Sequence, residues 1–213
     1  MKLCFVTPKI GNDLAGWKMV IEEVVAGGAD MIQIRDKKSP KSEILEAAKA
    51  IQPLLKKNHI ALIINDYIDI ALTVQADGVH LGQSDGSVQK ARRILGTGAI
   101  IGLSVENLEQ AFATTHENVT YLAASPVFTS TTKRDCSQPW GLAGLKQLCA
   151  AAPHPIFAIG GIDLDNIGEV IKCGVAGIAV VSAIAHADCP KTATERFKWK
   201  LHKYNLDARE RNF

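Results

Sequence analysis

The sequence predicts a (β/α)8 barrel that forms one domain over residues 1–213. Short apolar runs alternate with longer segments of helical period from one end of the chain to the other. No Pro/Ser-rich linker or low-complexity stretch interrupts this alternation. Dividing 213 residues by eight units gives about 27 residues per unit, which is compact for this fold but within its range. A doubly wound open sheet would show the same alternation, so the pattern alone leaves the closure of the sheet open.

Eight short apolar runs are the candidate strands. They fall at residues 3–6, 31–34, 61–64, 78–81, 100–103, 121–124, 156–159 and 178–181. Between the first two runs, Trp17, Ile21 and Val24 recur at helical spacing, which predicts an amphipathic helix. Ser39 followed by Pro40 predicts an N-cap and a first-turn proline for the next helix.

The nearly balanced charge excludes partners that bind through a large surface of one charge sign. Twenty-four Lys and Arg against 22 Asp and Glu leave a net charge of +2. We therefore expect binding neither to nucleic acid nor to a membrane surface. No apolar run approaches the roughly 18–20 residues that span a bilayer. Any anionic ligand must be bound by a local group of residues.

The cysteines predict neither a disulfide framework nor a structural zinc site. Cys4, Cys136, Cys149, Cys173 and Cys189 are odd in number and include no CxxC pair. The first residues lack the long apolar region and the small-residue cleavage site of a secretory signal. We expect a cytoplasmic protein with reduced thiols.

Polar residues collect where the predicted strands end, which is where (β/α)8 barrels carry their active sites. In chain order these residues are Gln33, Arg35 and Lys37, then Asn65 and Asp66, then Asp85, then Ser104, then residues 130–133, then Gly160 and Gly161, and finally Ser182. Packing alone does not explain so many polar residues at equivalent positions. The sequence therefore predicts a polar site at this end of the barrel.

The segment QIRDK contains a candidate diphosphate grip. Alternation along an extended chain places Gln33, Arg35 and Lys37 on one side, and Ile34 and Asp36 on the other. A guanidinium fork and an ammonium on the same side could hold one anion together. An isolated segment of this kind could also be a solvated strand end.

Asp66 and Asp85 are candidate metal ligands. They follow strands that neighbour each other in the predicted sheet, and adjacent strands lie about 4.8 Å apart, so two carboxylates could share one ion. Oxygen ligands without histidine or thiolate favour Mg²⁺ over zinc, and Mg²⁺ typically combines one or two carboxylates with substrate phosphates. Either aspartate alone could instead cap the following helix.

The last three strand ends are candidates for a phosphate site. Residues 129–132 form a hydroxyl-rich segment that is followed by Lys133. Gly160, Gly161 and Ser182 follow the last two strands, where barrels often bind phosphate through backbone N–H groups. The glycine pair could also serve only a tight turn.

Taken in order, these motifs resemble the thiamine phosphate synthase family, also called thiamine-phosphate pyrophosphorylase. The resemblance runs from residue 31 to residue 184 and is carried by QIRDK, IINDYIDIAL, ADGVHLGQSD, IGLS, PVFTSTTK, AIGGI and GIAVVSAI. It implies a (β/α)8 barrel that joins hydroxymethylpyrimidine diphosphate to hydroxyethylthiazole phosphate and releases diphosphate, with Mg²⁺ as cofactor. In the implied dissociative mechanism, diphosphate leaves first and the thiazole nitrogen captures a pyrimidine-methyl cation.

The resemblance also implies roles for individual residues. The pyrimidine-diphosphate site would comprise Gln33, Ile34, Arg35, Asp36, Lys37, Asn65, Ser104 and Lys133. The thiazole phosphate site would comprise Ser130, Thr132, Gly161, Val181 and Ser182, with Thr131 in the same loop. Arg35, Lys37, Ser104 and Lys133 would stabilise the leaving group, and Asp66 and Asp85 would bind Mg²⁺. The chain departs from the usual family pattern at Asp36, Ser125 and Ser130, and at Glu106, near which the family has a histidine.

Two other functions remain open from the sequence. A thiazole tautomerase relative would share the barrel and the phosphate site but would need neither diphosphate nor metal. A noncatalytic phosphate-sensing barrel would keep the phosphate site alone. We expect His80 to be a hydrogen-bonded barrel histidine rather than a general base. The sequence leaves open whether the chain forms a homo-oligomer.

Overall fold

The computed structural model contains eight parallel strands that close into a barrel in the order β1 to β8. It describes residues 1–129 and 138–210. The strands are β1 Lys2–Val6, β2 Met31–Ile34, β3 Ala61–Asn65, β4 Gly78–Leu81, β5 Ile100–Val105, β6 Tyr121–Ala124, β7 Ile156–Ile159 and β8 Gly177–Val180. Strand β8 pairs with β1 in parallel, with Leu3 opposite Ile178. This pairing closes the sheet, so the predicted barrel is confirmed and the open sheet is excluded.

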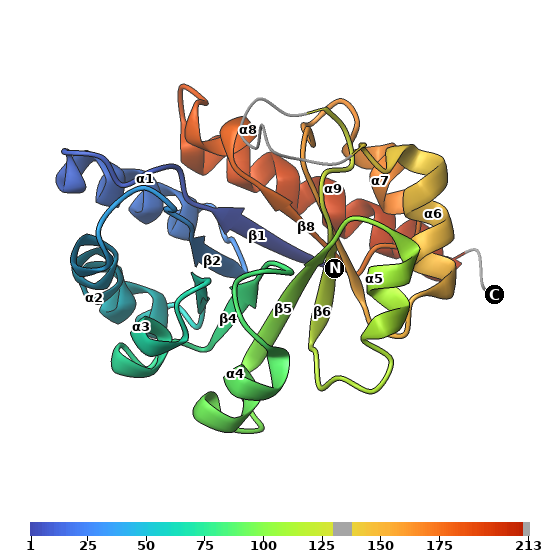
Figure 1. Cartoon of the computed structure of the whole chain (residues 1–213). Coiled ribbons are helices and arrows are strands. Elements are labelled where there is room, and N and C mark those ends of the chain that lie inside the picture. Colours follow the sequence, from blue (N-terminus) through green and yellow to red (C-terminus); the bar gives the residue numbers. More distant parts are fainter. Residues whose placement is uncertain (130–137, 211–213) are drawn as a thin grey trace.

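The helices lie outside the strands (Figure 1). They are α1 Leu14–Ala26, α2 Lys41–Lys57, α3 Ile68–Thr73, α4 Val88–Leu95, α5 Leu108–Ala113, α6 Gly141–Ala151, α7 Ile167–Lys172, α8 Ser182–Ala185 and α9 Pro190–Glu210. The last helix contacts α1, α7, α8 and β1, so it joins the two ends of the chain around the barrel.

Strand alternation divides the buried residues into two layers. Leu3 and Phe5 of β1 belong to the larger cluster, which includes the helices, whereas Cys4 and Val6 belong to the smaller cluster inside the barrel. In β2, Ile34 likewise belongs to the outer cluster, while Gln33 lines the central cavity. The two-residue period of each strand therefore decides which side chains can meet a ligand at the barrel centre.

The start of α2 differs from the prediction. The helix begins at Lys41, and Pro40 occupies the N-cap position without a side-chain capping bond. Ser39 lies one residue outside, where its backbone N–H donates to Asp36 Oδ1 at 3.0 Å. The extended backbone of Pro40, with ψ of 148°, explains why the helix starts one residue later than the Ser-Pro pair indicates.

Within residues 1–129 and 138–210, no helix is long and apolar enough to cross a bilayer. Cys4, Cys149, Cys173 and Cys189 are free. Cys136 lies outside the described residues.

Candidate active site

A chamber opens at the carboxyl ends of the strands and contains about 880 Å³ of empty space, part of it continuous with solvent. Polar residues from neighbouring strands line it: Gln33 and Arg35 from β2 and its end, Asn65 from β3, His80 from β4 and Ser104 from β5. Strand alternation turns Gln33, His80 and Ser104 inward, because each occupies an interior position of its strand. These polar residues lie up to 71 positions apart in the sequence, from Gln33 to Ser104.

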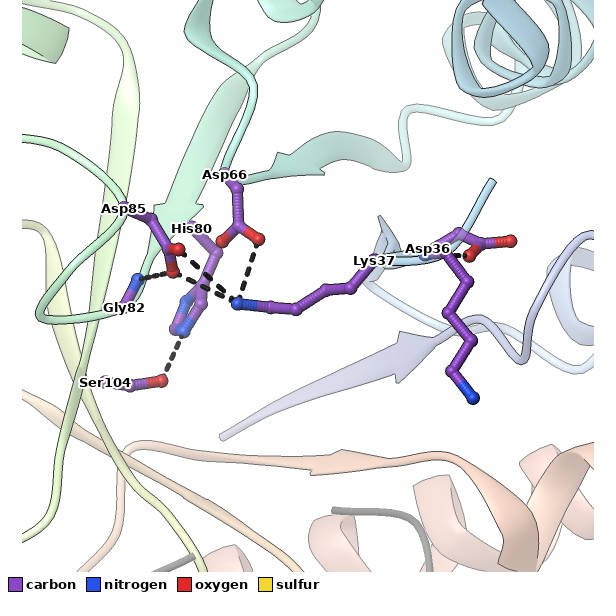
Figure 2. A network of polar contacts seen from close by, with 8 residues as sticks. Asp36, Lys37, Asp66, His80, Gly82, Asp85 and Ser104 are labelled. Atoms are coloured by element: carbon purple, nitrogen blue, oxygen red, sulfur yellow. Dashed lines mark hydrogen bonds and ion pairs between the residues drawn. The ribbon is translucent and has the colours of Figure 1, made fainter. Parts of the chain in front are cut away.

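Lys37, Asp66 and Asp85 form a charged cluster that links the ends of β2, β3 and β4. The Lys37 ammonium lies 3.1 Å from Asp66 Oδ2 and 3.3 Å from Asp85 Oδ2. Figure 2 shows the lysine side chain extended toward both carboxylates, with His80 and Ser104 in the same view. Asp85 Oδ2 also accepts a hydrogen bond from the Gly82 backbone N–H at 3.0 Å, which fixes the carboxylate in the loop after β4.

The backbone holds Asp66 in an uncommon conformation. Its φ is 65°, in the left-handed region that few residues other than glycine adopt. Its N–H donates to the His80 carbonyl at 2.9 Å, which extends the β3–β4 pairing by one residue. Backbone strain of this kind is concentrated at functional sites, where surrounding structure holds it in place. Asp66 does not cap α3, because Tyr67 occupies that position.

The two carboxyl groups differ in acidity although they share one lysine. Burial, together with the neighbouring Asp85 carboxylate, raises the pKa of Asp66 to about 6, and Lys37 opposes this shift. Burial also disfavours ionisation of Asp85, but contacts with Asp66, Lys37 and the Gly82 N–H hold its pKa below the ordinary value. The same two carboxylates raise the pKa of Lys37 against the effect of burial. The cluster therefore combines one carboxyl group of raised pKa and one of lowered pKa around a single ammonium.

The donor set fits a magnesium ion. Asp66 Oδ1 is buried and has no hydrogen-bond partner in the described part of the chain, so one acceptor remains available for a ligand. No group of three or more His, Cys, Asp or Glu that could hold a metal occurs within residues 1–129 and 138–210. Two carboxylates completed by water and substrate phosphates are a typical magnesium site, whereas an all-protein calcium or zinc site needs more ligands.

The side chains of QIRDK alternate between the chamber side and the outer core, as predicted for an extended chain. Gln33 and Arg35 line the chamber, and Lys37 reaches the two aspartates. The Ile34 side chain is buried in the outer core. Asp36 is also buried, and its carboxylate accepts hydrogen bonds from the N–H groups of Ile10, Lys38 and Ser39. The side chains of Ile34 and Asp36 therefore support the backbone of residues 33–37 from outside the chamber.

The far wall of the chamber includes Gly161, Val181 and Ser182. Gly161 has a φ of 66°, and a Cβ atom there would lie 2.7 Å from Phe128 Cβ. Glycine is required at this position because the loop after β7 lies directly against the loop after β6. Val181 and Ser182 begin the short helix α8. Ser130, Thr131, Thr132 and Lys133 lie outside the described residues.

Comparisons with known proteins decide the family. The family model described as thiamine monophosphate synthase matches residues 3–184. The chain belongs to the thiamine monophosphate synthase family. A thiamine-phosphate synthase of Vibrio campbellii is 44% identical over 86% of this chain and 90% of the relative. A thiamine-phosphate synthase of Halalkalibacterium halodurans is 43% identical over 89% of this chain and 90% of the relative.

The solved structures agree with this assignment. A thiamine phosphate pyrophosphorylase from Pyrococcus furiosus superposes with a TM-score of 0.84 and 35% identity, over 95% of this chain and 96% of that one. A 3-hexulose-6-phosphate synthase superposes with a TM-score of 0.70 at 18% identity, a likeness that extends to the fold alone. The predicted family is therefore confirmed by sequence and by structure.

In this member of the thiamine monophosphate synthase family, the chamber also contains residues that sequence reasoning did not assign to the site. Tyr121, Ser125 and Phe157 line it together with Cys4. Alternation along β6 and β7 could have indicated that Tyr121 and Phe157 face inward, but apolar and aromatic residues in a strand carry no signal that separates a ligand wall from a packed core. His80 is hydrogen-bonded to Tyr121 and Ser104, as expected for a barrel histidine.

Proposed function

We propose that this chain is a thiamine phosphate synthase, which joins hydroxymethylpyrimidine diphosphate to hydroxyethylthiazole phosphate and releases diphosphate. The observation that carries the proposal is the Lys37–Asp66–Asp85 cluster at the rim of a chamber that also holds Arg35. A cationic grip beside two carboxylates suits a metal-bound diphosphate, which a tautomerase relative would not need. Family membership and relatives named thiamine-phosphate synthase support the same activity.

The first half of the reaction breaks the bond between the pyrimidine methylene carbon and the diphosphate oxygen. Negative charge then develops on the departing diphosphate. Arg35 would hold its oxygens through a planar fork and Lys37 through a point charge, while the Ser104 hydroxyl would donate a hydrogen bond. Donors that are already in place stabilise this charge without a cost of reorganisation, so no general base is needed at the carbon.

Asp66 and Asp85 would hold Mg²⁺. Asp66 Oδ1, which has no hydrogen-bond partner among the described residues, supports this assignment. A bound magnesium ion would supply positive charge to the diphosphate oxygens. In this structure the Lys37 ammonium lies between the two carboxylates. With magnesium bound to both aspartates, the ammonium would contact the diphosphate instead.

The second half of the reaction is capture of the pyrimidine-methyl cation by the thiazole nitrogen. Gly161, Val181 and Ser182 would bind the thiazole phosphate with backbone N–H groups and a hydroxyl, together with residues 130–132. A nucleophile held at fixed distance gains the advantage of proximity, which accounts for a large share of the rate in such sites.

One assay tests the proposal. The purified protein is incubated with both heterocyclic phosphates and Mg²⁺, and thiamine phosphate is measured by mass spectrometry, with and without a chelator. Metal-dependent formation of thiamine phosphate is the expected result. Binding of both phosphates without product would favour a phosphate-sensing barrel, and isomerisation of a thiazole phosphate without coupling would favour a tautomerase. The cytoplasmic location stays a prediction of the sequence.

A further inference from the structure

A chain of three polar side chains, of which Tyr121 and His80 are buried and Ser104 is half-buried, lies in the chamber wall formed by β4, β5 and β6. His80 on β4 lies between the other two: its Nδ1 is 3.0 Å from the Tyr121 hydroxyl, and its Nε2 is 2.8 Å from Ser104 Oγ. Figure 2 shows the contact between the imidazole and Ser104. Tyr121 and His80 are both buried, with 4% and 7% of their surfaces exposed. The proposed mechanism uses Ser104 but gives His80 and Tyr121 no role.

A neutral imidazole has one donor nitrogen and one acceptor nitrogen, so this chain can be hydrogen-bonded in two directions. In one direction, Ser104 donates to Nε2 and Nδ1–H donates to the Tyr121 oxygen. In the other, Tyr121 donates to Nδ1 and Nε2–H donates to Ser104 Oγ. Only the second direction leaves the Ser104 proton free to point into the chamber.

The surroundings of Tyr121 select between these two directions. In the described part of the chain, His80 is the one hydrogen-bond partner of the Tyr121 hydroxyl. If Nδ1–H donated to the tyrosine oxygen, the phenol proton would be buried without an acceptor, which is costly. Burial raises the pKa of Tyr121 well above its ordinary value, so the phenol keeps its proton. Tyr121 is therefore the donor, His80 Nδ1 the acceptor, and Nε2 carries the imidazole proton.

The contact between the Tyr121 hydroxyl and His80 Nδ1 depends on the absence of a side chain at Gly102. A Cβ atom on Gly102 of β5 would lie 2.4 Å from the Tyr121 hydroxyl and 2.5 Å from His80 Nδ1. The tyrosine ring also packs against Phe157, with ring centroids 4.5 Å apart. The absence of a side chain at Gly102 and the presence of Phe157 thus hold the Tyr121 hydroxyl against Nδ1.

We propose that His80 and Tyr121 are positioning residues that direct the Ser104 hydroxyl proton into the chamber, toward the anionic diphosphate of the pyrimidine substrate. The role of Ser104 toward diphosphate rests on the proposed function, whereas the direction of the hydrogen bonds rests on the structure alone. With the direction reversed, Ser104 would present lone pairs to the diphosphate oxygens, and two acceptors would face each other. The buried Tyr121 prevents this reversal, although it is linked to Ser104 only through His80 by two successive hydrogen bonds.

The direction can be measured without any substrate. Protein labelled with ¹⁵N-histidine is studied by NMR at mildly alkaline pH, and the His80 signals are assigned by their loss in His80→Gln. We expect the proton on Nε2 and none on Nδ1. A protonated Nδ1, alone or together with Nε2, would overturn the proposal whatever the activity of the protein.

The link to the reaction is measured by a double-mutant cycle between Tyr121→Phe and Ser104→Ala. Tyr121→Phe removes only the hydroxyl and keeps the ring against Phe157. It should lower kcat/KM for the pyrimidine diphosphate about tenfold, the loss typical of one hydrogen bond in a chain that ends on a charged group. In the Ser104→Ala background the same change should cost less than about twofold, because the residue through which it acts is gone.

The matched control is Tyr204→Phe, the same deletion on α9, where the tyrosine lies beside Gly168 far from the chamber. It should leave kcat/KM unchanged. Equal effects of Tyr121→Phe in both backgrounds would reduce His80 and Tyr121 to a packing role and overturn their positioning role. A wild-type protein that makes no thiamine phosphate would instead refute the proposed function. The NMR experiment tests the direction of the hydrogen bonds independently of that outcome.

Discussion

Asp66 and Asp85 show how two identical side chains acquire different properties from their surroundings. Asp66 is the more deeply buried and carries the raised pKa, while Asp85 is stabilised as an anion by a backbone N–H and by Lys37. One ammonium cannot satisfy all four carboxylate oxygens, and Asp66 Oδ1 has no hydrogen-bond partner among residues 1–129 and 138–210. We propose that a bound magnesium ion and a diphosphate would complete this pairing by supplying a partner for Asp66 Oδ1.

Replacing Asp85 by alanine should remove magnesium-dependent turnover. The change deletes one of two anionic ligands, and we expect turnover to fall by a factor on the order of 10² or more, while the melting temperature stays close to that of the wild type. Thiamine phosphate formation is measured over a range of Mg²⁺ concentrations. Asp69→Ala is the control, because this exposed aspartate pairs with Lys41 on the surface. Full activity of Asp85→Ala in the presence of a chelator would remove the assigned metal site.

Asp36→Ala tests whether the Asp36 carboxylate serves structure or substrate. The change leaves the N–H groups of Ile10, Lys38 and Ser39 without their acceptor. We expect the free energy of unfolding to fall by about 1–3 kcal/mol and KM for the pyrimidine diphosphate to change little. Denaturant unfolding and steady-state kinetics measure the two effects. A large rise in KM at unchanged stability would return Asp36 to the substrate site.

The same residue predicts a pH dependence. Burial opposes ionisation of Asp36, but hydrogen bonds from backbone N–H groups hold its pKa below the ordinary value. A pKa that is lower in the folded state contributes stability above the unfolded pKa of about 4, and this contribution disappears as the pH falls through the folded value. The stability difference between wild type and Asp36→Ala should therefore be largest at neutral pH and narrow at about pH 3. A difference that is constant with pH would contradict this account.

At the scale of elements, the two halves of the chamber come from different parts of the barrel. The ends of β2 to β5 carry the cationic and acidic residues, whereas the loop after β7 and the start of α8 carry Gly161 and Ser182. The loops after β6 and β7 are in contact through Gly160 and Gly161, where a Cβ atom would meet Pro126 and Phe128 at 2.6 and 2.7 Å. This arrangement predicts two phosphate sites that can be altered separately.

Ser182→Asp should damage one of these sites selectively. A carboxylate at the start of α8 would repel the thiazole phosphate and raise its KM, with a smaller effect on the pyrimidine diphosphate. Initial rates are measured with each substrate varied in turn. Ser182→Asn, which is similar in size but uncharged, is the control and should raise KM far less. Equal losses of both affinities would show that the two sites are not separate.

At the scale of the whole molecule, α9 closes the outer layer although it lies beyond the residues that match the family. The family match ends at residue 184, and α9 covers Pro190–Glu210. Its Phe197 is completely buried, and Leu201 is 2% exposed. The helix packs on α1 and β1, so it ties the end of the chain to its beginning. The barrel core therefore depends on a segment far from the chamber.

Phe197→Ala should destabilise the protein without changing the chemistry. Removal of a buried phenylalanine leaves a cavity, and the expected loss is about 3–5 kcal/mol in the free energy of unfolding. At a temperature where the variant is folded, KM for both substrates should stay close to the wild-type values. Trp199→Ala on the same helix is the control, since this side chain is 61% exposed, and its effect should stay within about 0.5 kcal/mol. Similar losses in the two variants would contradict the assigned packing of α9.

The sequence by itself determined where the strands lie along the chain and on which face of each strand a side chain lies, because both follow from local periodicity. Strands at 31–34, 78–81, 121–124 and 156–159 were predicted at their observed bounds, β3 and β5 run one and two residues further, and β8 lies one residue earlier. The alternation in QIRDK separated Gln33 and Arg35 from Ile34 correctly for the same reason.

Only the tertiary structure decided how residues from different strands share their contacts. Three examples are the hydrogen bond from the Ile10 N–H to Asp36, the ion pairs of Lys37 with two aspartates, and the contact of His80 with Tyr121. The residues in each of these pairs lie 26 to 48 positions apart. Such pairings depend on the closure of the barrel and on the registers between strands, which bring side chains together in space. Periodicity along the chain specifies the face on which a residue lies, but it does not specify the partner that it meets there.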